Sequence, residues 1–307
     1  MITVLAGGTG SVKLVRGLAL QTTDLKVVSN VGDNIWLHGL YVCPDIDTII
    51  YGLADMLDKR QGWGVKNDSF GFLRQMEMLG EEMWFKIGDR DLATHLLRTN
   101  MLKNGKNLSE ITDWMRSRYA IAPKIIPATD NPMETKVVTD RGEMHIQEFW
   151  VKYGGEPNVL NIVYSGADRS RVNPRAIDAL KRSKIIVIAP ANPITSIGPI
   201  LAIKGIRKEL IAQKKKIIAV SPMIGNEAVS GPAAKYMRAM DLQNSPIGVA
   251  KYYSDFVSKL IISASDWRLS TEINRLDIKA YETDIIMRNA DDESRVALYL
   301  LKRFKNF

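Results

Sequence analysis

Three glycines near the N-terminus are the first residues of this chain that could bind a ligand. Gly7, Gly8 and Gly10 lie in the stretch AGGTGSVKL, between a short apolar run and a run of helix-forming residues. Glycine lets backbone N–H groups approach a ligand closely, and the N-terminus of a helix attracts anions. The stretch therefore predicts a phosphate site at Gly7, Gly8, Thr9 and Gly10. The alternative is a tight turn that binds nothing.

This glycine loop does not fit the two common nucleotide-binding motifs. A dinucleotide-binding loop needs a third glycine where Lys13 stands. It also needs an acidic residue at the end of the second strand, which here ends in Ser29 and Asn30. A Walker A loop needs a Gly-Lys-Ser/Thr ending, which the loop lacks. NAD is therefore disfavoured as a ligand.

Two aspartates, Asp45 and Asp47, stand close together in the stretch VCPDIDT. Pro44 favours the start of a helix, so the two could simply be a first-turn acid and a helix cap. Side chains two positions apart point to different faces of a helix, so both could face one ligand only if Asp45 precedes the regular helix. As catalytic groups they could accept a proton or assist a metal ion.

Few other residues could carry chemistry. The three histidines lack metal-site spacing, so a metal would need oxygen ligands, and Mg²⁺ is the expected ion. Arg90, in the stretch IGDRDLATH, begins a predicted helix and is by default a surface residue. Trp84 and Phe85 are typical of packing residues, although they could also form the floor of an aromatic pocket.

Parallel strands are expected to position these groups. Apolar runs predict strands at residues 1–6, 25–30, 161–165, 184–190, 216–222 and 259–264. In open sheets of this kind, ligands bind beyond the carboxyl ends of the strands. The loops there span residues 30–34, 165–170, 189–199 and 221–233 and are rich in Gly, Ser, Asn, Asp and Pro. They predict a large polar ligand.

Residues 44–150 interrupt this pattern. Helices are predicted near 68–79, 90–102 and 108–119, and a β-hairpin within 135–149. The predicted fold is α/β, with a Rossmann-like, doubly wound, mainly parallel sheet and a largely helical inserted cap. Residues 1–43 and 151–307 would form the core, and 44–150 a mainly helical insertion with a β-hairpin.

The composition excludes several classes of protein. The 307 residues are 46% hydrophobic and 25% charged, as in ordinary globular proteins, and no apolar run is long enough to span a bilayer. A single cysteine rules out internal disulfides and is typical of a cytoplasmic protein. The net charge of +8, without basic clusters interleaved with aromatic residues, suits small anionic ligands rather than nucleic acid.

Six ordered motifs together give the chain a family resemblance. They are AGGTGSVKL, VCPDIDTIIYGLAD, WGVKNDSFGF, IGDRDLATH, NPITSIGPI and SPMIGNEAVSGPAAK. This series resembles the 2-phospho-L-lactate transferase family of coenzyme F-420 biosynthesis, from the first strand to the final helix. The resemblance implies a cytoplasmic, Mg²⁺-dependent enzyme with a Rossmann-like core that forms a homodimer.

The resemblance also implies substrates and their contacts. The phospholactate of lactyl-2-diphospho-5'-guanosine would pass to the deazaflavin alcohol Fo, giving GMP and coenzyme F-420-0. A close variant would use a donor that carries phosphoenolpyruvate. Asp47 and Asp45 would be catalytic, and Asp47 and Arg90 would contact the deazaflavin. The residues implied for the guanosine diphosphate are Gly7, Gly8, Thr9, Gly10, Lys13, Asn192, Thr195, Ser196, Gly198, Gly225, Asn226, Ser230 and Gly231.

Two points stay open at this level. Asp45 and Asp33 are the candidate metal ligands, but many relatives carry a second acid where this chain has Asn34, which puts the metal role in doubt. The competing function is that of a related family of bacterial regulators, which share the core and bind nucleotide-sugars without transferase activity. Replacing Asp47 by Asn is expected to reduce turnover sharply, with little loss of fold stability.

Overall fold

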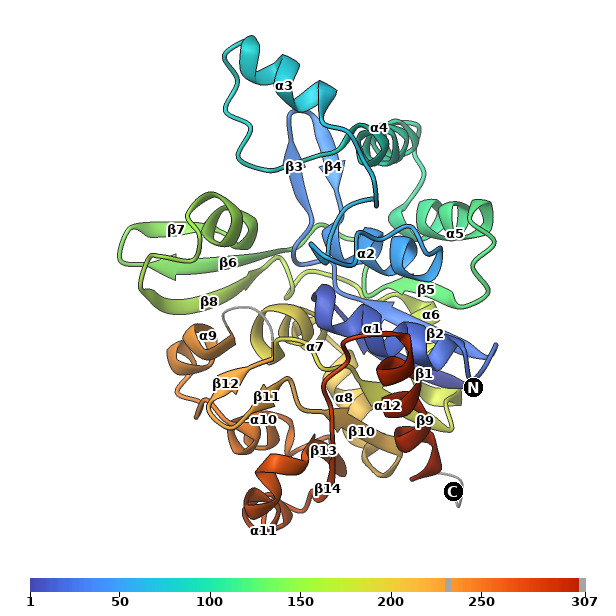
Figure 1. Cartoon of the computed structure of the whole chain (residues 1–307), viewed down its shortest axis with the longest axis vertical. Coiled ribbons are helices and arrows are strands. Elements are labelled where there is room, and N and C mark those ends of the chain that lie inside the picture. The colour runs from blue at the N-terminus through green and yellow to red at the C-terminus, as the bar shows by residue number, and fades with distance from the viewer. Residues whose placement is uncertain (230–232, 304–307) are drawn as a thin grey trace.

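A computed structural model describes residues 1–229 and 233–303 of the protein (Figure 1). At its centre lies a seven-stranded parallel sheet with the strand order β14-β13-β10-β9-β1-β2-β5. The strands are β1 (Ile2–Ala6), β2 (Leu25–Ser29), β5 (Lys124–Pro127), β9 (Ile185–Ile188), β10 (Ile217–Val220), β13 (Lys259–Ser263) and β14 (Lys279–Thr283). The predicted α/β fold with a doubly wound parallel sheet is confirmed.

The central strands are buried along their whole length and consist mainly of apolar residues, so helices can cover both faces of the sheet. Every residue of β1, β10 and β13 is buried. Parallel strands buried on both faces read as continuous runs of Val, Ile and Leu rather than as alternating patterns. For this reason the inner strands are the part of the fold that the sequence predicts best.

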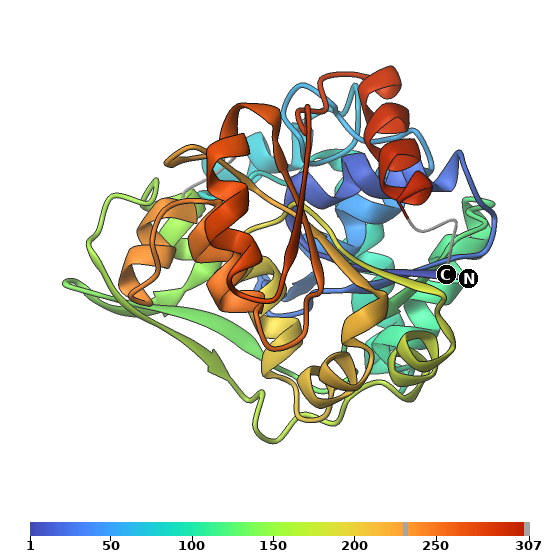
Figure 2. The same ribbon diagram turned by 90° about the horizontal axis from the view of Figure 1, so that it is seen from below.

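Helices cover both faces of this sheet. Figure 2 shows α1 (Gly8–Ala19) and α12 (Ala290–Lys302) on one side, and α6 (Pro174–Arg182) and α8 (Ile206–Ala212) on the other. α2 (Pro44–Leu53) packs beside α1. Arg16 of α1 pairs with Glu293 of α12 through two of its nitrogens. The C-terminal helix is thereby attached to the helix that begins at the glycine loop.

The segment 44–150 contributes helices around one end of the sheet. α3 (Gly71–Met78), α4 (Asp89–Lys103) and α5 (Leu108–Arg118) follow α2, beside the hairpin of β3 (Ile35–Leu37) and β4 (Leu40–Val42), in the upper part of Figure 1. The division into a core and an insertion stays a prediction. However, β5 lies within 44–150 and forms one edge of the central sheet, so part of that segment belongs to the core.

The strand predicted at 161–165 lies in a different sheet. β8 (Val159–Ser165) pairs antiparallel with β6 (Glu134–Thr139), which also pairs with β7 (Gly142–His145). The expectation of a parallel strand there is therefore wrong, because an apolar run does not specify its partner. The β-hairpin predicted within 135–149 is confirmed as β6 and β7.

Shorter elements complete the described chain. They are η1 (Glu148–Lys152), η2 (Pro193–Ile197), α7 (Gly198–Ala202), η3 (Lys214–Lys216), β11 (Met223–Ile224), β12 (Glu227–Ala228), α9 (Ala233–Ala239), α10 (Pro246–Tyr253), η4 (Ala264–Leu269) and α11 (Ser270–Asn274). In residues 1–229 and 233–303 no helix is both long and apolar enough to cross a membrane.

Candidate active site

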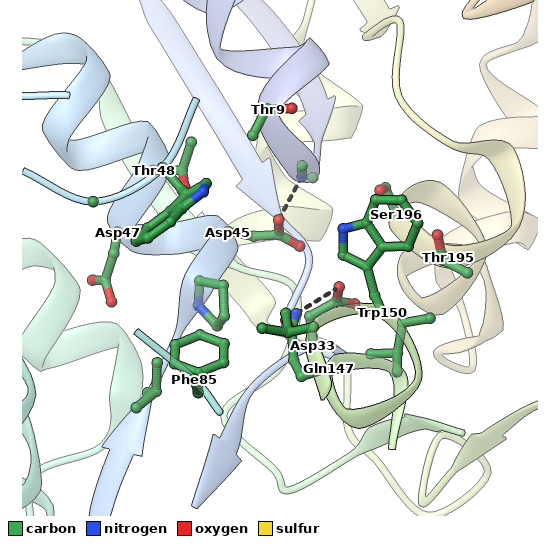
Figure 3. A pocket seen from close by; sticks show the side chains of 18 of the residues that line it. Thr9, Asp33, Asp45, Asp47, Thr48, Phe85, Gln147, Trp150, Thr195 and Ser196 are labelled. Carbon is green, nitrogen blue, oxygen red and sulfur yellow. Dashed lines mark hydrogen bonds between the residues drawn. The ribbon is translucent and has the colours of Figure 1, made fainter. Parts of the chain in front are cut away.

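A cavity of about 720 Å³ opens at the carboxyl ends of β1, β2 and β9 (Figure 3). The loops after these three strands form one part of its wall, and residues from α2, α4 and η1 form another. The predicted site residues that line it are Gly7, Gly8, Thr9, Gly10, Asp33, Asp45, Asp47, Asn192, Thr195 and Ser196. The structure thus brings ten sequence-predicted residues to one cavity.

The glycine loop presents the start of α1 to this cavity. Gly7, the residue before α1, has no side chain to cap the helix, and the N–H of Gly8 donates to Asp45. The N–H groups that follow Gly8 are therefore the ones left without intrahelical partners. Gly8 has a φ of +69°, a left-handed conformation that a side chain would strain. A Cβ at Gly7 would lie only 3.0 Å from the carbonyl oxygen of Ser196. Glycine at these positions therefore keeps the helix start accessible to an anion.

Asp33 and Asp45 form an acidic pair held by one amide group. The Nδ2 of Asn30 donates to Asp33 Oδ1 at 2.8 Å and to Asp45 Oδ2 at 2.7 Å. The N–H of Gly8 donates to the other oxygen of Asp45. Burial raises the pKa of Asp45 to about 6, even though these hydrogen bonds lower it. Burial and the nearby charge of Asp45 together raise the pKa of Asp33 well above its ordinary value.

Asp47 lines the same cavity but faces a different partner. Figure 3 shows its side chain pointing away from Asp45. Both of its oxygens accept hydrogen bonds from the guanidinium of Arg98, with Nη1 to Oδ2 at 3.0 Å. Both aspartates lie inside α2, so Asp45 does not precede the regular helix, and yet both residues line the cavity. Side chains on two faces of the first turn of α2 therefore line one cavity.

α4 places three further polar residues beneath Asp47. Asp91 and His95 line the cavity, and Arg98 lies one turn beyond them. Nη1 of Arg98 lies 3.3 Å from Nδ1 of His95, whose Nε2 lies 3.4 Å from Oδ1 of Asp91. The hydroxyl of Tyr51 donates to the same Asp91 oxygen at 2.7 Å. Burial favours a raised pKa for Asp91, but the hydrogen bond and charge of His95 lower it below its ordinary value.

Aromatic side chains form another part of the wall. They are Tyr51, Trp63, Trp84, Phe85, Trp150 and Tyr236. The rings of Trp84 and Phe85 meet edge to face, with centroids 5.8 Å apart, and Phe85 and Trp150 are labelled in Figure 3. Such a wall suits a planar ring system, because aromatic faces and edges pack against one another favourably. Both interpretations of Trp84 and Phe85 apply, because the two residues line the cavity and also pack against a small buried apolar cluster.

The loop after β9 supplies polar groups beside the acidic pair, since Nδ2 of Asn30 also donates to the carbonyl of Thr195 at 3.4 Å. The side chain of Asn192 accepts hydrogen bonds from the N–H groups of Ile194 and Thr195, at 2.9 and 3.2 Å. Asn192 thus caps η2 and fixes the loop in the wall. Thr195 and Ser196, which follow it, both line the cavity.

Two residues predicted for the nucleotide do not line this cavity. Nζ of Lys13 donates to the carbonyl of Met287 at 2.9 Å, so it helps attach α1 to the C-terminal segment. Gly198 packs against Tyr164, whose hydroxyl would lie 2.1 Å from a Cβ at position 198. Both residues therefore have a packing role in the described structure.

The loop around β11 and β12 also lies apart from the cavity wall. The N–H of Gly225 donates to both carboxylate oxygens of Asp266, at 3.0 and 3.1 Å, and Asn226 beside it is exposed. Ser230 and Gly231 lie outside the described residues. These four residues stay predictions for the nucleotide.

Arg90 is exposed and does not line the cavity. Its Nη1 donates to the carbonyl of Lys66 at 3.2 Å, and its backbone N–H donates to Asp68. The arginine of α4 that contacts a cavity residue is Arg98, which binds Asp47 from behind the wall and which the sequence analysis missed. Its signal is the spacing of Asp91, His95 and Arg98 at i, i+4 and i+7, which places them on one face of a helix.

The whole chain is similar to one family of enzymes. A family model described as 2-phospho-L-lactate transferase CofD matches residues 2–293. The 2-phospho-L-lactate transferase of Methanosarcina mazei is 38% identical over 98% of this chain and 99% of its own length. Those of Methanocaldococcus jannaschii and Methanopyrus kandleri are 39% and 40% identical, over 98% of this chain and 97% and 96% of theirs.

One solved structure shares the fold at low identity. A member of the UPF0052 family from Bacillus halodurans superposes with a TM-score of 0.65, at 13% identity, over 98% of this chain and 99% of its own. This likeness concerns the Rossmann-like architecture alone.

Proposed function

The chain belongs to the 2-phospho-L-lactate transferase family, and from this premise we propose its substrates, which its residues must bind and align. The donor is lactyl-2-diphospho-5'-guanosine, and the acceptor is the deazaflavin alcohol Fo. The transfer releases GMP and forms coenzyme F-420-0. The observation that carries this proposal is a single cavity lined by the start of α1, by polar loops and by several aromatic residues.

The diphosphate of the donor is assigned to the glycine loop. The N–H groups at the start of α1 and the positive end of its dipole favour a phosphate there. Thr195 and Ser196 offer further hydrogen bonds from the loop after β9. Lys86, whose side chain is exposed where it lines the cavity, adds a positive charge.

The acceptor is assigned to the aromatic side of the cavity. A deazaflavin carries a planar ring system that can stack on Trp or Phe side chains, and a ribityl chain that ends in a hydroxyl. Asp47 lines the same cavity as the aromatic residues, and we propose that it accepts a hydrogen bond from that hydroxyl. Arg90 as a second contact to the deazaflavin stays a prediction.

Mg²⁺ is proposed to bind at Asp33 and Asp45. Two carboxylates with raised pKa values that share one amide donor favour a cation between them. The described residues contain no group of three or more His, Cys, Asp or Glu side chains that could hold a metal. A two-carboxylate site suits Mg²⁺, which commonly keeps several waters and takes further ligands from a substrate phosphate. When bound, the ion would neutralise charge on the diphosphate.

The proposed step forms one bond and breaks one. The ribityl oxygen attacks the phosphorus that carries lactate, the bond from that phosphorus to the bridging oxygen breaks, and GMP leaves with the bonding electrons. Asp47 accepts the proton of the attacking hydroxyl. Such transfers depend on in-line positioning and on stabilising the charge of the transferring group. The helix start of α1 would stabilise the charge of the transferring group, and Asp47 would position the attacking hydroxyl.

The experiment that tests this function combines the purified chain, the guanosine-linked donor, Fo and Mg²⁺. We expect GMP release together with an Fo product heavier by one phospholactyl group, measured by chromatography and mass spectrometry. Release of GMP without a heavier deazaflavin would contradict the assignment of the acceptor. A visible-absorbance titration with Fo alone separates this function from that of a nucleotide-sugar-binding regulator, which should not bind Fo.

The resemblance also implied a homodimer. We propose that state for the chain in solution, and light scattering coupled to size-exclusion chromatography tests it. A monomeric mass at working concentrations would contradict it.

A further inference from the structure

Arg98 is a charged residue that lies almost completely out of reach of solvent and of the cavity. Its side chain is 1% exposed, and it does not line the cavity. Nevertheless its two terminal nitrogens bind both oxygens of Asp47, a residue 51 positions earlier that does line the cavity. This paired geometry fixes the plane of the Asp47 carboxylate, because the guanidinium is itself planar.

Other contacts hold Arg98 in place. Nη1 also donates to the carbonyl of Tyr41 at 3.3 Å and lies 3.3 Å from Nδ1 of His95, while Nη2 lies 3.8 Å from the sulfur of Met115. Nε has no hydrogen-bond partner among the described residues. The polar contacts of Arg98 are therefore made through its two terminal nitrogens, on the side of the guanidinium that faces Asp47.

The pair is charged in the folded protein. Burial alone lowers the pKa of Arg98, but the adjacent Asp47 carboxylate outweighs this effect and raises the pKa above its ordinary value. A buried ion pair is on average no more stabilising than apolar residues of the same volume. Fold stability alone therefore does not explain why this charge lies behind the cavity wall.

We infer that Arg98 is a positioning residue for the transfer reaction, which fixes the Asp47 carboxylate in the orientation that receives the acceptor hydroxyl. Arg98 itself touches no substrate and acts only through Asp47. This inference rests on the proposed function. It predicts that the loss of the paired contact lowers kcat much more than it changes the KM for the guanosine-linked donor, which is bound elsewhere in the cavity.

The first test replaces Arg98 by lysine, which keeps the charge but loses the planar two-nitrogen contact. We expect R98K to lower kcat by about 10- to 100-fold with a nearly unchanged donor KM, since small misplacements of a reacting group cost this much. The matched control is R16K, which removes the same kind of paired contact, to Glu293, away from the cavity. We expect R16K to lower the melting temperature and to keep the wild-type kcat.

The second test asks whether Arg98 acts through Asp47. We expect the D47N/R98Q double variant to have the kcat of D47N within about 2-fold, because residues that act as one unit are not additive. This double variant buries no unpaired charge, so we expect it to fold. Its kcat can therefore test the inference even if R98K fails to fold.

Two results would overturn the inference. One is R98K with wild-type kcat and only a lowered melting temperature, like R16K. The other is D47N/R98Q with a further loss of about 10-fold or more relative to D47N, since additive effects indicate independent roles. An inactive wild type in the same assay would instead contradict the proposed function, so the two failures are distinguishable.

Discussion

The two aspartates of the PDIDT motif have different surroundings, and these separate their roles. Asp45 belongs to an acidic pair with a raised pKa, which favours a cation or a proton. Asp47 has its negative charge balanced by Arg98. The sequence alone left the roles of the two residues open, because their partners come from distant segments. With the partners known, we propose metal binding for Asp45 and orientation of the acceptor for Asp47.

The surroundings of Asp47 also change the expected effect of its replacement. D47N leaves the buried Arg98 without a counter-charge, and breaking a buried ion pair costs about 3 kcal/mol or more. We therefore expect D47N to lower both the free energy of unfolding and kcat, the latter by about 100-fold. This differs from the expectation, based on sequence alone, that the fold would be little affected.

Urea denaturation and the GMP-release assay measure these two effects of D47N. The control is D168N, at an exposed carboxylate that does not line the cavity, and it should change neither quantity. Normal stability of D47N would show that the buried guanidinium finds another partner.

Mg²⁺ binding can be checked without turnover. A ligand that binds only the folded state raises its stability by mass action. We expect the melting temperature of the wild type to rise with Mg²⁺ concentration and that of D45N to stay constant, as followed by differential scanning fluorimetry. An equal rise in both proteins would place the ion away from Asp45.

At the scale of elements, the inner strands and the β6–β7 hairpin could be predicted, whereas β5 and the pairing of β8 could not. β9, β10 and β13 lie within two residues of their predicted bounds, because an all-apolar strand has a strong signal. β5 was missed, since it is short, lies at the edge and ends in a proline. β8 was placed in the wrong sheet, because its apolar residues include the exposed Leu160 and Val163.

The parts of the candidate site that lie in loops with recognisable sequence motifs could be predicted. The glycine loop and the loop after β9 reach the cavity as expected, since both follow inner strands. The contact between Asp47 and Arg98 was not predictable, because it depends on how α4 packs against α2. The aromatic wall is a similar case, since Trp63, Trp84 and Trp150 come from separate segments that only the folded chain brings together.

The second hairpin contains a histidine that should make stability depend on pH. His145 of β7 is 9% exposed, its Nε2 has no partner among the described residues, and burial lowers its pKa. A lowered folded-state pKa means that the unfolded chain binds the proton more readily, so stability falls as pH falls below about 6.5. We expect the free energy of unfolding of the wild type to decrease relative to that of H145N as the pH is lowered from about 7 to about 5.

Chemical denaturation of both proteins across this range measures the difference. Asparagine keeps an acceptor for the N–H of Gln147, which now bonds Nδ1 of His145 at 3.1 Å. Parallel pH profiles of the two proteins would contradict a lowered pKa of His145.

At the scale of the whole molecule, the C-terminal helix stabilises the helix that opens the site. Leu300 of α12 is fully buried, while Leu298 on the same helix is 39% exposed. We expect L300A to cost about 2–5 kcal/mol of unfolding free energy, as large-to-small core substitutions do, and L298A to cost far less. Both should keep the donor KM, because neither residue lines the cavity. An unchanged unfolding midpoint for L300A would contradict the packing of α12 on the core.

The amide of Asn30 has a consequence for how far this molecule could be redesigned. A dinucleotide-binding enzyme uses an acidic side chain at the end of its second strand to hold ribose hydroxyls. In this molecule the same place holds an amide nitrogen that donates hydrogen bonds to two neighbouring acids. Exchanging that nitrogen for oxygen would crowd three carboxylates into one buried spot. A cofactor swap toward nicotinamide carriers would therefore require rebuilding the acidic pair first, and no single substitution could achieve it.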